Sequence, residues 1–211
     1  MPTLTEKEFF DSLLEKTKTA FGNSLTKKKY PGEKWGCAVC DTPIQKGKGI
    51  IFGINWGNAA KTEQTAYPKS DKRFKGNKFI SSSEKYIREF LKSEVKDLNY
   101  SNLCFFRTPF ANNLPDEDWK LAIPLFMEYV AYINPPWMLM LGKPNKLSLH
   151  AQVEKVKAMS RKTNKAAYGY YGSAFGNIPF VSVPHPQAWL SMEVRTELWR
   201  KVIIENKYFP K

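Results

Sequence analysis

The sequence predicts an α/β fold, in a three-layer α/β/α arrangement around a central, mostly parallel sheet of four strands. Two observations predict it. Four short apolar runs of strand length alternate with helical patterns, and such alternation gives parallel strands joined by right-handed crossovers. No linker rich in Pro, Gly or Ser divides the 211 residues, so we expect a single domain, residues 1–211.

The first part of this domain, residues 1–45, is expected to be a helix followed by a basic, turn-rich extension. Thr5 and Glu8 have the spacing of a capping box, and apolar residues then recur at helical spacing as far as Gly22. The α/β core is expected to follow, over residues 46–211.

Within this core, the four expected strands are short apolar runs bounded by Gly, Pro or Asn. They cover residues 49–54, about 101–107, 137–141 and 178–183. Helical patterns separate or follow them: one begins at the capping box of Ser81 and Glu84, and the others cover about 113–134, 147–159 and 191–203. Residues 168–177, rich in Gly, Tyr and Ser, are expected to be a loop.

Composition and charge limit the classes of protein that fit this chain. With 42% hydrophobic residues it can bury a core, which excludes disorder for most of its length. No apolar run approaches the ~20 residues of a membrane span, and the charged N-terminus is unlike a signal peptide, so we expect an intracellular protein that does not enter membranes. A formal charge of +13 favours a polyanionic partner, nucleic acid first.

Polar turns follow the expected strands where they leave the sheet. In open parallel sheets ligands bind at the carboxyl ends of the strands. Gly53 to Gly57 (Gly-Ile-Asn-Trp-Gly) follows the first strand, and His185-Pro186-Gln187 follows the fourth. The second strand adds Asn102, and Arg107-Thr108 face the same region. Taken singly, each of these is better explained as a turn or structural residue.

Together the motifs resemble the uracil-DNA glycosylase superfamily, whose members carry a Gly-Ile-Asn-Pro-Gly type of motif after the first strand and a His-Pro-Ser type after the last. Three further stretches resemble its mismatch-specific thymine/uracil and single-strand-selective branches: Tyr67-Pro68, Asn77-Lys78-Phe79 and Tyr100 to Leu103. The resemblance covers residues 49 to about 190. Trp56 stands where relatives have Pro, and Gln187 where they have Ser.

The resemblance implies a monofunctional DNA glycosylase of base excision repair, a monomeric hydrolase with no metal or nucleotide cofactor. Such an enzyme flips uracil or a related pyrimidine out of the DNA stack and hydrolyses its N-glycosidic bond. By resemblance, Asn55 positions the attacking water, and His185 donates a hydrogen bond to the leaving base. Losing one such donor typically costs about 2.7–4 kcal/mol of transition-state stabilisation.

Further roles follow from the same resemblance. The expected substrate-binding residues are Gly53, Ile54, Trp56, Gly57, Tyr67, Phe79 and Asn102. The expected DNA-binding residues are Gln187, Trp189, Leu190 and Ser191 near the second motif and, from the positive charge run and not the resemblance, Lys155, Lys157 and Arg161. Tyr67 would stack on the flipped base, with Phe79 as the second candidate, and Asn102 would read the base edge. The alternatives are that Phe79 is a core residue, Asn102 ties two strands together and Trp189 packs the last helix.

The basic residues of the core concentrate in two runs. Residues 61–78 hold six basic and two acidic residues, and residues 143–165 hold seven basic and one acidic residue. A charged run is commonly a solvated face. Both runs flank the motif loops, however, and a phosphate-binding surface requires that placement.

Two alternative functions remain at this point. One is a catalytically inactive nucleic-acid-binding protein of the same fold. The other is a thiol redox or metal protein that uses Cys37 and Cys40, which form a Cys-x-x-Cys motif. That motif lacks the strand-to-helix setting of redox sites, and only three cysteines are present, so we expect no metal site.

Overall fold

The structure is a computed structural model, and it describes residues 4–33, 35–57, 63–68, 78–108, 114–160, 165–186, 188–206 and 209, with the backbone only for 78–81. The helices are α1 (Glu6–Asn23), α2 (Leu25–Lys29), α3 (Lys78–Leu91), α4 (Asp116–Ile133) and α5 (Met192–Ile203). The strands are β1 (Ile50–Asn55), β2 (Asn99–Cys104), β3 (Met138–Leu141), β4 (Ala151–Met159), β5 (Ala166–Ala174) and β6 (Ile178–Val183).

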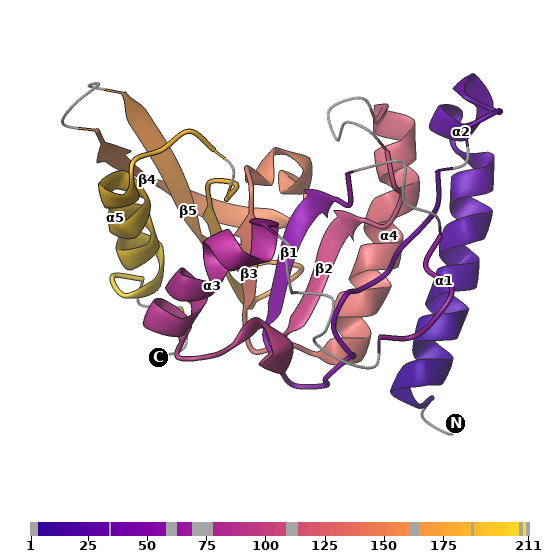
Figure 1. Cartoon of the computed structure of the whole chain (residues 1–211), viewed down its shortest axis with the longest axis horizontal. Coiled ribbons are helices and arrows are strands. Elements are labelled where there is room, and N and C mark those ends of the chain that lie inside the picture. The colour runs from indigo at the N-terminus through magenta and orange to yellow at the C-terminus, as the bar shows by residue number, and fades with distance from the viewer. Residues whose placement is uncertain are drawn as a thin grey trace.

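The strands form one sheet in the order β2-β1-β3-β6-β5-β4 (Figure 1). The neighbours among β2, β1, β3 and β6 pair in parallel, and β5 and β4 continue the sheet antiparallel. The α/β prediction is therefore confirmed, and the four expected strands are the four parallel ones. The expected number is wrong, because the sheet has six strands.

The two unexpected strands form a long hairpin where the sequence predicts a helix over 147–159 and a loop over 168–177. Val153, Val156 and Met159 are spaced by three residues, which imitates one face of a helix. The glycines of β5 suggest a loop, but Gly172 lies where two strand backbones meet. A Cβ there would come within 2.0 Å of the Gln152 carbonyl oxygen, so glycine is required for the pairing of β4 with β5.

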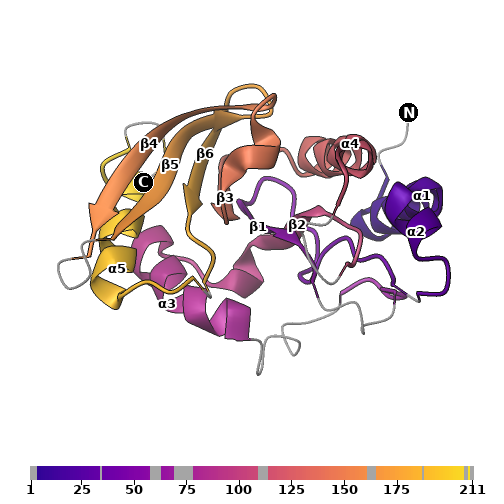
Figure 2. The same ribbon diagram turned by 90° about the horizontal axis from the view of Figure 1, so that it is seen from above.

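Helices lie on both sides of the sheet (Figure 2). On the side of α1 and α4, a core forms around Ile50, Phe52 and Phe126; on the side of α3 and α5, a second core forms around Ile51 and Leu139. Successive residues of β1 thus enter opposite cores, as expected for a parallel strand buried on both faces. Among the described residues, no helix is long and apolar enough to cross a membrane.

The N-terminal extension docks on the core. The predicted capping box of Thr5 and Glu8 begins α1, and Phe9 of α1 stacks on Tyr132 of α4 with ring centroids 3.7 Å apart. The chain then runs antiparallel beside β2, where the amide of Ala38 donates to the Phe105 carbonyl over 2.9 Å. The extension therefore covers the outer edge of β2.

Candidate active site at the carboxyl edge of the parallel strands

Strands β1, β3 and β6 end at one edge of the sheet, and the two expected catalytic side chains lie at or just after the ends of β1 and β6. Asn55 ends β1, and His185 follows β6 by two residues. β3 lies between these strands, so two strand spacings, about 10 Å, separate the backbones of β1 and β6. The amide of Gly142, just after β3, donates to the Val183 carbonyl over 2.9 Å and ties the edge together.

The Asn55 side chain is held at both ends of its amide. Its Nδ2 donates to Thr108 Oγ1 over 2.6 Å, and its Oδ1 accepts from the amide of Gly57 over 3.2 Å. Gly57 has φ +51°, in the left-handed region, so glycine suits the turn that brings this amide back to Asn55. The side chain is half-buried, and its oxygen has a defined direction.

Trp56 is occupied in holding the N-terminal extension. Its indole Nε1 donates to the carbonyl of Ala38, its ring lies edge-on to Tyr100, and the Arg107 guanidinium carbon lies 5.5 Å from the ring centroid. The tryptophan at this motif position thereby joins the end of β1 to the segment beside β2.

His185 is half-buried, and its loop is fixed to α5. Burial lowers the pKa of His185 below its ordinary value of 6.5, and the charge of Arg195 lowers it further. The Arg195 guanidinium donates to the carbonyls of His185, over 3.2 Å, and Ala188, over 2.8 Å. The imidazole is therefore neutral at neutral pH, with one ring N–H as a donor and the other nitrogen as an acceptor.

The loop from Ala188 leads directly into α5. Trp189 is fully exposed, so it does not pack on the last helix. Leu190 is partly buried against the cluster under α5, and Ser191 caps that helix by accepting from the Val194 amide over 3.3 Å. A large indole in solvent thus stands four residues from His185.

The remaining expected substrate-binding residues face different surroundings. Asn102 is buried and lies opposite Gly53 in the register of β1 and β2, and Ile54 packs toward the α4 side. Tyr67 faces α1: its ring lies edge-on to Phe10, with centroids 5.3 Å apart, and its hydroxyl accepts from the Ile44 amide over 2.8 Å.

Three expected side chains lie outside the described part of the chain. Phe79 falls in the first turn of α3, where only the backbone is described, and Arg161 and Gln187 lie outside the described residues. Lys155 and Lys157 are described and exposed on β4.

Two residues that contact the site have roles that the sequence did not predict. Thr108 orients Asn55, although the sequence indicates only that Thr108 follows the second strand. Arg195 holds the His185 loop from the first turn of α5, and no pattern in the sequence marked it. Thr108 acts through a hydrogen bond between segments 53 residues apart, whereas Arg195 binds carbonyls 10 and 7 residues before it in the chain.

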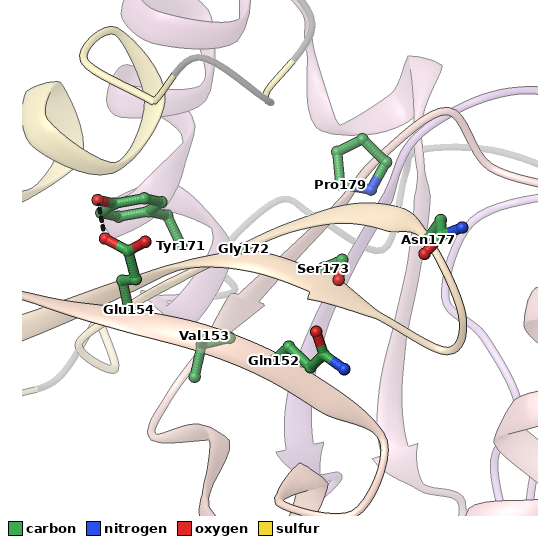
Figure 3. Close-up of a pocket in the computed structure, with 8 residues that line it drawn as sticks. All are labelled: Gln152, Val153, Glu154, Tyr171, Gly172, Ser173, Asn177 and Pro179. Carbon is green, nitrogen blue, oxygen red and sulfur yellow. Dashed lines mark hydrogen bonds between the residues drawn. The ribbon is translucent and has the colours of Figure 1, made fainter.

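A separate hollow of about 580 Å³ lies at the opposite edge, between the hairpin and the start of β6 (Figure 3). The Tyr171 hydroxyl donates to Glu154 inside it. Its other lining residues are Gln152, Val153, Gly172, Ser173, Asn177 and Pro179. None of the expected site residues lines this hollow.

The three cysteines are all buried. Cys37, Cys40 and Cys104 form no disulfide, and burial raises the pKa of Cys37 to about 12. A thiol with that pKa is protonated at neutral pH and is a poor nucleophile or ligand. Among the described residues, no three His, Cys, Asp or Glu side chains group as a metal site would require.

Comparisons with known proteins give no family for this chain. No protein-family model matches it, and no curated protein matches it significantly.

Proposed function

We propose that this protein is a monofunctional DNA glycosylase that hydrolyses the N-glycosidic bond of uracil or a related pyrimidine. The observation that carries the proposal is the oriented amide of Asn55 at the same sheet edge as the neutral imidazole of His185. The proposal includes a uracil-DNA glycosylase-like, three-layer arrangement around β2, β1, β3 and β6, with the hairpin as an addition. It also includes a monomeric enzyme of base excision repair, acting inside the cell.

The oriented amide suits the placing of a water molecule. Asn55 Oδ1 accepts one hydrogen bond from Gly57, which leaves a second lone pair for a water. The Gly57 N–H can only donate, so it fixes which end of the Asn55 amide is the oxygen, and Nδ2 at the other end donates to Thr108. An amide is not a useful base, so Asn55 acts by holding water in line with the sugar carbon.

The neutral imidazole suits the departing base. When the bond from the sugar carbon to the pyrimidine nitrogen breaks, the electron pair leaves with the base, and negative charge spreads to its carbonyl oxygens. A ring N–H of His185 stabilises that oxygen as a hydrogen-bond donor, without first transferring a proton. The oxygen of the water forms the new bond to the sugar carbon that held the base, and the water releases one proton to solvent.

Access to the base requires that its nucleotide leave the stack, and the loop after His185 offers a wedge. Trp189 is fully exposed there, and Leu190 and the α5 cap at Ser191 follow it directly in the chain. An apolar side chain of this kind can fill the space that the flipped nucleotide leaves. Phosphates on either side would meet basic residues such as Lys155 and Lys157.

The test is base release by purified protein from oligonucleotides that hold one uracil, single-stranded or opposite G or A. We expect alkaline cleavage at the uracil position, unchanged by EDTA. A panel of damaged pyrimidines in the same position then identifies the preferred base. Oligonucleotides that bind but remain uncut in every case would contradict the proposal.

A second candidate function is nucleic-acid binding without catalysis, and the placement of Tyr67 favours it. The expected stacking ring packs against α1, and its hydroxyl is used by the Ile44 amide. The same assay separates the two functions, because a binding protein retains affinity for the oligonucleotide and releases no base.

A further inference from the structure

The hairpin of β4 and β5 has one covered side and one open side. On the covered side Ala158 of β4 and Ala167 of β5 pack with residues of α5. Successive side chains of a strand point to opposite sides, so the alternate residues point away from α5. We call these the hairpin face: Val153, Lys155, Lys157, Met159, Tyr168 and Tyr170.

The hairpin face is open to solvent. Val153, Met159 and Tyr168 are each more than a third exposed, which is unusual for large apolar side chains on a sheet. Figure 2 shows α5 beneath the hairpin and α4 beside β2, and among the described helices none lies over the hairpin face. An open sheet face with apolar side chains indicates an interaction surface.

The charge on this face has one sign. Lys155 and Lys157 both project from it, whereas Glu154, the one acidic residue of the two strands, lies on the covered side and binds the Tyr171 hydroxyl. The face therefore attracts an anionic partner, and no carboxylate of β4 or β5 opposes it.

Each of the two lysines on the face stands opposite a tyrosine of the neighbouring strand. Lys155 pairs with Tyr170 and Lys157 with Tyr168 in the strand register, and the two pairs are two residues apart, about 6.8 Å. Lys155 Nζ lies 3.7 Å from the centroid of the Tyr168 ring. The two lysine–tyrosine pairs thus place a cation beside an aromatic ring twice in succession. Single-stranded nucleic acid has a matching repeat, because each nucleotide carries a phosphate and a base.

One end of the hairpin face lies at the same end of the sheet as the candidate active site. Tyr170 is opposite Ser182 in β6, three residues before His185, so Tyr168 lies at the edge where β6 ends. In Figure 1 the end of β4 and the arrowheads of the parallel strands point to the same side of the molecule. The face lies on the α1 and α4 side of the sheet, like Phe180, so a DNA strand bound at the site would reach it by passing over this end of the sheet.

We propose that the hairpin face binds single-stranded DNA, with Tyr168 and Tyr170 stacking on bases and Lys155 and Lys157 contacting phosphates. Bases in a duplex are stacked on each other and offer no free ring face, so the tyrosines select an unpaired strand. Lys155 leaves the Tyr168 ring for a phosphate when a base stacks there. The choice of DNA as the polymer rests on the proposed function, and the stacking surface rests on the hairpin alone.

This inference is tested by fluorescence anisotropy with a labelled oligothymidylate of twelve nucleotides. That probe contains no uracil, so binding is measured independently of uracil release. We expect wild type to bind the single strand more tightly than the matching duplex. Replacing both tyrosines (Tyr168→Thr, Tyr170→Thr) should lower affinity for the single strand at least about tenfold. Replacing both with Phe keeps the rings and should leave affinity within about twofold.

If Lys155 and Lys157 contact phosphates, the affinity for the oligonucleotide depends on salt concentration through them. Lys155→Gln with Lys157→Gln should make log affinity fall less steeply with log salt, the slope changing by about 1.4 for two phosphate contacts with a single strand. Lys28→Gln with Lys120→Gln removes the same charge from exposed positions on α2 and α4, and should change the slope much less. Tyr30→Thr is the matched control for loss of an exposed ring.

A measurement on wild type keeps the inference testable if the threonine variant does not fold. Ultraviolet crosslinking of oligothymidylate followed by mass spectrometry should place crosslinks on the peptide that holds Tyr168 and Tyr170. Crosslinks confined to other peptides, or single-strand affinity unchanged in a folded threonine variant, would overturn it. A dimer in sedimentation that the threonine variant dissociates, with DNA affinity unchanged, would also overturn it and would assign the face to a second copy of the chain.

The inference and the proposed function can fail separately. If the protein releases no base while the hairpin variants lose oligothymidylate binding, the proposed function fails and the DNA-binding face stands. If base release is found while the variants bind as wild type, the face fails and the proposed function stands.

Discussion

The four parallel strands and the β4–β5 hairpin belong to one sheet but differ in what covers them. Phe52 and Leu139 of the parallel part are fully buried, on opposite sides of the sheet. In the hairpin, Val153 and Tyr168 are exposed on one side while Ala158 and Ala167 are buried on the other. From this difference we infer that the parallel part, buried on both sides, positions the side chains of the site, and that the open hairpin is suited to contact with a partner.

The largest effect expected from this difference is on stability. Phe52→Ala removes a ring that packs against Phe126 and Phe180, and should lower the free energy of unfolding by about 3–5 kcal/mol. Val153→Ala on the hairpin face should change it by about 0.5 kcal/mol or less. Urea unfolding of both variants measures this, and equal losses would contradict the comparison.

The same division explains how much of the fold the sequence could predict. The parallel strands are buried on both sides, so each appears as an unbroken apolar run bounded by turn residues. β4 has an exposed side, and both of its sides carry apolar as well as polar or charged residues, so the sequence shows no apolar period of two. In β5, Gly172 is required because the backbone of β4 approaches it closely at Gln152. This contact is evident only once the two strands are paired.

The second prediction concerns chemistry at the end of the parallel part. His185→Ala should lower single-turnover base release by about 10²–10³-fold, the effect of losing one donor to developing negative charge. His150→Ala is the matched control, since His150 stacks on Phe175 away from the site, at the start of β4. Equal rates for wild type and His185→Ala would remove the role given to His185.

The candidate site could be predicted only in part. Asn55 and His185 were predicted because short motifs place them after strands whose ends meet at one edge. Thr108 depends on a hydrogen bond to a segment 53 residues away, and Arg195 on bonds to backbone carbonyls of an irregular loop, and no local pattern of residue types encodes either. The sequence suggests that the Tyr67 ring lies near the site. It does not indicate that this ring packs against Phe10 of α1, as it does in the structure.

A smaller effect is expected from Thr108. Thr108→Val keeps the shape and removes the oxygen that accepts from Asn55 Nδ2, at a cost of about 0.5–1.5 kcal/mol for one hydrogen bond. We expect the rate of the chemical step to fall roughly three- to tenfold with oligonucleotide affinity unchanged, and Thr108→Ser to restore it. A loss of affinity without a change in the step would show that Thr108 does not act through Asn55.

The smallest effect is a pH dependence of stability. The pKa of His185 is lowered in the folded protein, so below about 6.5 the unfolded chain binds more protons and stability falls. His185→Gln lacks this contribution, so its Tm should decrease less than that of wild type between pH 7.5 and pH 5. Parallel Tm curves for the two proteins would contradict the lowered pKa.

The most direct test of the account is single-turnover release of uracil by wild type and by Asn55→Ala, with Asn177→Ala as the matched control. Asn177 is an exposed asparagine that lines the hollow at the opposite edge. The account predicts that wild type and Asn177→Ala release uracil at equal rates, and that Asn55→Ala is slower by about a hundredfold or more, because the attacking water is no longer positioned. No release by wild type, or equal release by Asn55→Ala, would contradict it.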